Sequence, residues 1–197
     1  LPRRVHRQGH GADALAALAA RMARTPDATW PDALMLLGDQ VYADAGSPRT
    51  RAFIRARRDT SGPHGDEVRD FEEYTQLYAE AWGDPPIRWL LSTVPSAMIF
   101  DDHDVHDDWN TSLAWKREIR TQPWWDDRIA AAFASYWVYQ HLGNMSLSEL
   151  AVDDLYARVL RAEDAAPILL AHALRADRVG DDFHTLGDHP VDRCGDG

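Results

Sequence analysis

The sequence predicts an α/β fold with a helix-rich C-terminal half. Two short apolar runs have the length of buried strands, and several longer segments show the periodicity of amphipathic helices. The chain has 197 residues, the size of one domain. Apolar residues make up 45% of it and charged residues 27%, which is typical of a globular protein.

The N-terminal part is predicted to form a helix, a strand and a loop. Asp13 is a suitable cap for a helix whose apolar positions recur three and four residues apart, at Leu15, Leu18, Ala19 and Met22. The apolar run 33–37, which Gly38 ends, has the length of a buried parallel strand. Residues 43–65 are polar and rich in Gly, Pro, Ser and Arg, and we expect a long loop there.

The rest of the chain is predicted to be one further strand among helices. A helix is expected over 66–82, a short one over 87–91, and a strand over 97–100. Residues 123–178 read as a helical subregion, with a deeply buried helix over 129–139. Ser146 and Glu149 form a capping box for a helix that runs on to Leu160, and another helix is expected over 166–176.

Polar residues follow the first predicted strand. Gly38 permits a sharp turn, so that Asp39 would point its carboxylate beyond the edge of the sheet. A carboxylate there can bridge two cations, and Tyr42 is close enough to present its phenol to the same cavity. A Gly-Asp pair alone is also compatible with a turn that holds a solvated Asp.

A dense acidic cluster follows the second predicted strand. Residues 101–108 contain five Asp and two His, which repel one another unless cations or basic side chains intervene. Carboxylate oxygens and imidazole nitrogens suit divalent or ferric ions. The run is also compatible with a solvated acidic loop, although such loops less often follow a buried strand directly. Asn110, just beyond it, can bind an anion or a metal.

The two clusters together are stronger evidence for a shared cation site than either cluster alone. Both lie at the ends of predicted buried strands, and in a parallel sheet these ends lie at the same edge. The carboxylates of Asp39 and Asp102 are therefore expected to converge on shared cations.

These motifs carry a family resemblance. The chain contains G-D-Q-V-Y-A-D and then P-S-A-M-I-F-D-D-H-D-V-H-D-D-W-N. Over residues 30–112 it resembles the metallophosphatases similar to alkaline phosphatase D, the PhoD-like branch of the calcineurin-like superfamily. The resemblance implies a partial metallophosphoesterase-like α-β-β-α sandwich.

The resemblance also implies what the chain lacks. We expect residues 1–197 to be an incomplete metallophosphatase domain, because family members carry an earlier first-strand ligand and a closing His segment. Residues 187–189 read Gly-Asp-His and superficially echo that closing segment.

Roles for individual residues follow from the resemblance. Asp39 would bridge two metal ions, and Tyr42 and Asp102 would be further ligands. His103 would assist the leaving group or contact the phosphate, and Asp104 would orient this His. Three more residues are candidates for the second shell or the substrate: Asp44, His106 and Asn110.

The implied activity is hydrolysis of phosphomonoesters or phosphodiesters by a hydroxide activated at a two-metal centre. Two or more metal ions are expected, and their ligands are compatible with iron, calcium, manganese or zinc. Three alternatives stay open: a different metal-dependent hydrolase, a non-catalytic cation-binding relative, and a helical interaction domain that uses the helix over 129–139.

Charge and composition limit the partners. Acidic residues number 32 against 21 basic ones, so the formal charge is -11, and this field disfavours nucleic-acid binding. A small phosphorylated substrate remains compatible, because bound cations invert the local field. No apolar run reaches the length of a membrane span. The single cysteine, Cys194, favours a reducing compartment, so we expect a cytoplasmic location; the oligomeric state stays open.

Overall fold

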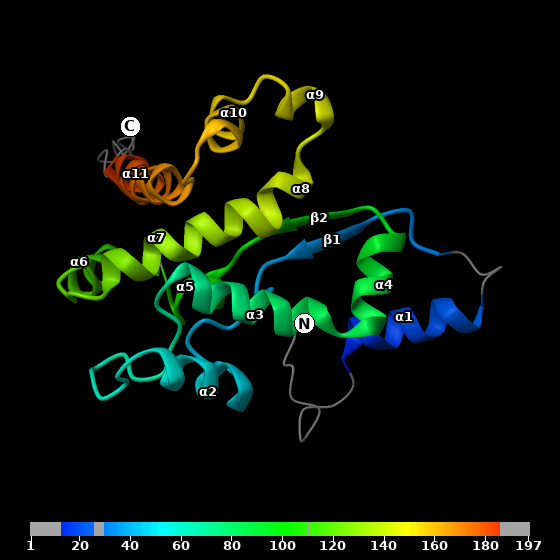
Figure 1. Ribbon diagram of the computed structural model, residues 1–197, viewed down its shortest axis with the longest axis horizontal. Coiled ribbons are helices and arrows are strands. Elements are labelled where there is room, and N and C mark those ends of the chain that lie inside the picture. The colour runs from blue at the N-terminus through cyan, green and yellow to red at the C-terminus, as the bar shows by residue number, and fades with distance from the viewer. Residues whose placement is uncertain (1–12, 26–29, 110, 186–197) are drawn as a thin grey trace, which may run out of the picture.

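A two-stranded parallel sheet lies at the centre of the protein (Figure 1). The computed structural model describes residues 13–25, 30–109 and 111–185. Strands β1 (Leu34–Leu37) and β2 (Ser96–Ile99) pair in parallel, with Leu34 opposite Ser96 and Leu37 opposite Ile99. Both predicted strands are therefore confirmed. The carboxyl ends of both strands lie at one edge, so the segments that follow them start side by side.

The first helix and the fourth form a small cluster of their own. Helix α1 (Ala14–Arg24) begins where the sequence predicts it, because the Asp13 side chain accepts hydrogen bonds from its first turn. Its Met22 packs with Leu90 of α4 (Pro85–Thr93), and both side chains are buried. Helix α4 begins with two prolines, which lack a backbone N–H. They are tolerated there because the N–H groups of the first turn have no intrahelical acceptor.

Helix α2 (Pro48–Arg57) overturns the prediction of a long loop over 43–65. Ser47 caps its first turn, and Ile54 is fully buried against the main core. Exposed arginines occupy most of the remaining surface of α2. Its apolar face is therefore too narrow to show a helical periodicity in the sequence. Helix α3 (Phe71–Gly83) follows, and its inward residues belong to the same core.

After β2 the chain is mostly helical and runs beside the sheet (Figure 1). This part begins with α5 (Asp102–Val105) and α6 (Leu113–Ile119). Helix α7 (Trp125–Tyr136) continues without a break into a π-helical turn, η1 (Trp137–His141), and then into α8 (Leu142–Asn144). Helix α7 is buried along most of its length, as the apolar sequence of this segment predicts.

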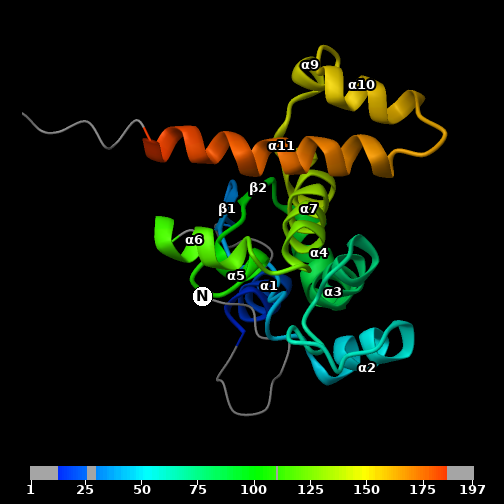
Figure 2. The same cartoon turned by 90° about the vertical axis from the view of Figure 1, so that its left-hand side faces the viewer.

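The last helices correct a second prediction. One continuous helix was expected from Ser146, but α9 (Leu147–Leu150) ends early and α10 (Asp154–Arg161) begins anew. The break occurs because Asp153 caps the first turn of α10. Helix α11 (Ala166–Thr185) is longer than predicted and lies across α7, as Figure 2 shows.

One face of the sheet is left open in the described part of the chain. Met35, Leu37 and Ile99 are 67%, 76% and 51% exposed, and the alternation of side chains along each strand puts all three on the same face. The second sheet that a sandwich requires is not among the described residues. What the structure holds is a mostly helical chain around a small parallel sheet.

Helix length and apolarity also bear on membranes. In the described ranges, no helix is both long enough and apolar enough to cross a bilayer.

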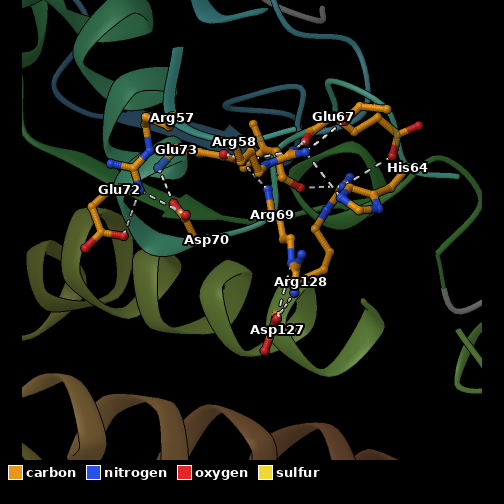
Figure 3. Close-up of polar contacts among 12 residues, drawn as sticks. Arg57, Arg58, His64, Glu67, Arg69, Asp70, Glu72, Glu73, Asp127 and Arg128 are labelled. Carbon is orange, nitrogen blue, oxygen red and sulfur yellow. Dashed lines mark hydrogen bonds and ion pairs between the residues drawn. The ribbon is translucent and has the colours of Figure 1, made fainter. Parts of the chain in front are cut away.

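A buried arginine ties α7 to the segments around the strand ends. Arg128 is fully buried, and its Nε donates to the backbone oxygen of Val105 over 2.8 Å. Its Nη1 donates to the backbone oxygen of Val68 over 2.5 Å and lies 3.3 Å from a carboxylate oxygen of Glu67. Figure 3 shows Arg128 within a network of basic and acidic side chains from α2, α3, the segment between them and α7. Through the hydrogen bond from Arg128 to Val105, the network fixes α5 against α7.

Candidate metal centre

A tight turn at the end of β1 aims the first carboxylate. Gly38 has φ 93 and Asp39 has φ 51, both in the left-handed region. A Cβ on Gly38 would lie 2.3 Å from the Cβ of Asp101, so only glycine fits this close approach of the two strand ends. The Gly38 N–H still donates to the backbone oxygen of Ile99 over 2.9 Å, which extends the sheet pairing into the turn.

The two strand ends bring three potential metal ligands together. Ligand atoms of Asp39, Asp102 and His103 all lie within 4.8 Å of one another. The carboxylates of Asp39 and Asp102 thus converge from neighbouring strand ends, as the parallel arrangement predicts. The Oδ1 atom of Asp39 is buried and accepts no hydrogen bond from the described residues, so this oxygen is an unsatisfied acceptor.

The electrostatics of Asp39 suit the binding of a cation. Burial raises the pKa of its carboxyl, and the neighbouring carboxylates of Asp102 and Asp101 raise it further, while His103 acts in the opposite direction. A cation among these oxygens would remove the repulsion and satisfy the unbonded Oδ1. Oxygen atoms with one imidazole are a donor set that divalent or ferric ions accept.

Tyr42 lies at the same group. Its hydroxyl donates to Oδ2 of Asp39 over 3.3 Å. Its ring centroid is 4.5 Å from that of His103, with the two planes tilted by 38°. The phenol therefore borders both Asp39 and His103.

His103 is held by Asp44 and not by Asp104, which was the expected partner. The Nδ1 atom of His103 lies 3.0 Å from Oδ2 of Asp44. Burial lowers the pKa of His103, but the carboxylates around it, Asp44 first and then Asp39 and Asp102, together outweigh this effect, so that the pKa is raised. The contact with Asp44 fixes the ring, while Nε2 lies 3.7 Å from Oδ1 of Asp107, beyond hydrogen-bond distance.

Asp104 instead holds the two strand-end loops together. Its carboxylate accepts hydrogen bonds from the backbone N–H groups of Gln40 and Val41, both over 3.2 Å, and of Asp101 over 3.0 Å. Burial raises the pKa of Asp104 to about 7, against the lowering by these donors. Because the contacts to both oxygens are with donors, the geometry fits the ionised form better.

The remaining candidates lie around this centre. The Nδ1–H of His106 donates to the backbone oxygen of Asp107 over 2.8 Å, and its ring neighbours Trp115 and Trp124. It is part of an aromatic cluster next to the site. Asn110 and residues 187–189 lie outside the described residues.

Two aspartates without an assigned role also lie at the centre. Ligand atoms of Asp107 and Asp108 are within 4.8 Å of one another and of Asp102. The Asp107 N–H donates to Asp44 over 2.9 Å, and the Asp108 N–H donates to Asp102 over 3.0 Å. The density of carboxylates in the sequence indicates this cluster, but spacing alone does not show that Asp102 is half-buried while Asp107 and Asp108 are exposed.

The fold and the site together define a class: a protein with an acidic and histidine-containing site at the carboxyl ends of parallel strands, suited to a cation. Comparison with known families is more specific. The family model of PhoD-like phosphatases matches residues 11–159, and the chain belongs to that family. No curated protein and no solved structure matches the chain. The matched range contains Asp39, Asp102 and His103.

Proposed function

We propose that the protein hydrolyses phosphomonoesters or phosphodiesters of small molecules, with two or more cations bound at the strand ends. The observation that carries this proposal is the convergence of Asp39, Asp102 and His103 within 4.8 Å at the edge of the sheet. Membership of a phosphatase family supports the reaction class. Asp39 and Asp102 would hold the cations, with the phenol of Tyr42 beside them.

The bound cations would supply charge neutralisation for the phosphoryl oxygens and a water of lowered pKa. The protein's own part is to position the substrate and move a proton. His103 is suited to the second task, since Asp44 holds the ring and favours its protonated form. Protonated at Nε2, it would donate that proton to the departing alkoxide, an effect of about two to four powers of ten in rate.

The proposal extends to the architecture. Parallel sheets are normally covered on both faces, whereas Met35, Leu37 and Ile99 are exposed on one face here. This apolar face fits the inner surface of one sheet in an α-β-β-α sandwich. The acidic formal charge of -11 favours small phosphorylated substrates over nucleic acids.

The test is cleavage of para-nitrophenyl phosphate and bis(para-nitrophenyl) phosphate by the full chain, with and without Mn²⁺. Asp39→Asn should abolish Mn²⁺-dependent cleavage, because it removes the charge on which the cations depend. Asp59→Asn is the matched control: Asp59 is an aspartate on the surface that bonds Ser61, away from the site. Cleavage that survives both chelation and Asp39→Asn would refute the proposal, and so would Mn²⁺ binding without any turnover.

A further inference from the structure

A buried glutamine contacts the carboxylate that joins the two strand-end loops. Gln140 is 1% exposed. Its Nε2 donates to the hydroxyl of Tyr78 over 2.9 Å and to Oδ1 of Asp104 over 3.4 Å. A buried amide is costly unless its hydrogen bonds are made, and here Nε2 is bonded while the buried Oε1 has no partner among the described residues, so the place of this side chain in the core depends on the two Nε2 contacts. Gln140 is therefore one of the residues, with Arg128, through which the α7–η1–α8 segment reaches the loops after the strands.

The path of the backbone explains how Gln140 reaches that position. It lies in η1, where the wider π-helical turn interrupts an otherwise α-helical path, and such turns often occur at functional sites. The preceding residue, Tyr139, donates to the hydroxyl of Thr75 over 3.0 Å. Two consecutive residues of η1 are thus anchored on helix α3, one on Thr75 and the other on Tyr78.

Asp104 links Gln140 to the metal centre. Its oxygens accept the N–H groups of Gln40 and Val41, the two residues directly after Asp39. Tyr74 of α3 adds a hydrogen bond from its hydroxyl to the Asp104 backbone oxygen over 2.9 Å. A shift of the Asp104 carboxylate would therefore move the turn that carries Asp39.

We propose that Gln140 is a positioning residue for the metal centre: it orients the Asp104 carboxylate, and Asp104 sets the turn at Asp39. The link to cation binding rests on the proposed function. The link between Gln140 and the turn does not, because it can be measured without any metal.

The first experiment follows amide hydrogen exchange by NMR on the full chain in EDTA. Gln140→Met keeps the length of the side chain and removes the amide. We expect the N–H groups of Gln40 and Val41 to exchange about tenfold faster, relative to amides within α3. Tyr139→Phe is the matched control, since it removes a hydrogen bond of the same turn that does not lead to Asp104.

The second experiment measures the affinity for Mn²⁺ by titration calorimetry. Gln140→Met should weaken binding about tenfold, and Tyr139→Phe should leave it unchanged. In an Asp104→Asn background, Gln140→Met should have no additional effect on the exchange of Gln40 and Val41, because a residue that acts through Asp104 is not additive with it.

Three results would overturn the proposal: unchanged exchange at Gln40 and Val41, an equal effect of Tyr139→Phe, or a full effect that persists in the Asp104→Asn background. Should Gln140→Met fail to fold, Gln140→Leu also removes the amide with a similar side-chain volume, and unchanged exchange at Gln40 and Val41 in that variant would refute the link. If the wild-type chain binds no Mn²⁺, the proposed function fails, while the exchange experiment still decides the role of Gln140.

Discussion

The Nδ1 atom of His103 lies 3.0 Å from Oδ2 of Asp44, although the two residues follow different strands. The same carboxylate accepts the N–H of Asp107 over 2.9 Å. Asp44 therefore joins the loop after β1 to both ends of the acidic segment after β2. This gives the imidazole a fixed orientation, with the carboxylate of Asp44 at Nδ1 and that of Asp107 3.7 Å from Nε2.

Asp44→Asn should lower the pKa of His103, because the charge that raises it above 6.5 is removed. In the wild type, the stabilising contribution of the pair is full below the unfolded pKa and is lost as pH rises through the folded pKa. The measurement is an NMR titration of the ring in EDTA, with Asp59→Asn as control. A titration curve of His103 that Asp44→Asn leaves unchanged would contradict the assignment.

Gly38→Ala should destabilise the protein and weaken cation binding. The new Cβ would lie 2.3 Å from the Cβ of Asp101, at a residue with φ 93. Strain of this kind costs on the order of 1–3 kcal/mol, and relaxing the clash would separate the two strand ends. Chemical denaturation measures the loss of stability. Gly83→Ala is the control, because nothing lies within 4 Å of its Cβ and its φ is not positive.

Arg128→Met should cost about 2–5 kcal/mol of unfolding free energy, since it leaves two buried backbone oxygens without their donor. These are the oxygens of Val105 and Val68; the third partner, the carboxylate of Glu67, is partly exposed to solvent. Urea denaturation tests this. Arg158→Met removes an arginine whose ion pair with Asp154, 3.7 Å apart, is solvent-exposed, and it should change stability by less than about 0.5 kcal/mol. Similar losses for the two variants would count against the bracing role of Arg128.

Mn²⁺ should stabilise the wild-type chain against heat, because a cation that binds only the folded state shifts the equilibrium. At about one hundred times its dissociation constant, the gain is about 2.7 kcal/mol. Asp39→Asn should lose this gain, and EDTA should reverse it in the wild type. Differential scanning fluorimetry is sufficient for the comparison. An equal rise in Tm for Asp39→Asn would show that the cation binds elsewhere.

Much of the arrangement around the strand ends could be predicted from the sequence. Short apolar runs ending in Gly38 and Asp101 identify the strands, and the common edge of a parallel pair brings their ends together. Helix α2 escaped prediction because its charged surface leaves only residues such as Ile54 on the core side. The strands were predictable because short apolar runs mark them, whereas helix α2 depends on contacts with residues that are distant in sequence.

The partner of His103 shows a different limit. Asp104 is adjacent in sequence, but its place in the short helix α5 directs its carboxylate toward the N–H groups of Gln40 and Val41. Asp44 reaches the imidazole across the gap between two loops. Neighbouring residues on one short helix point in different directions, so adjacency in sequence does not indicate contact.

The left-handed backbone at Asp39 has an evolutionary consequence. With φ 51, this aspartate occupies a conformation that glycine adopts more readily, and its carboxyl is crowded by like charges. Asp39→Gly should therefore yield a more robust protein, by on the order of 1 kcal/mol, that has lost its cation affinity. Selection for thermal stability alone would favour the loss of this aspartate. Its retention would indicate selection for cation binding.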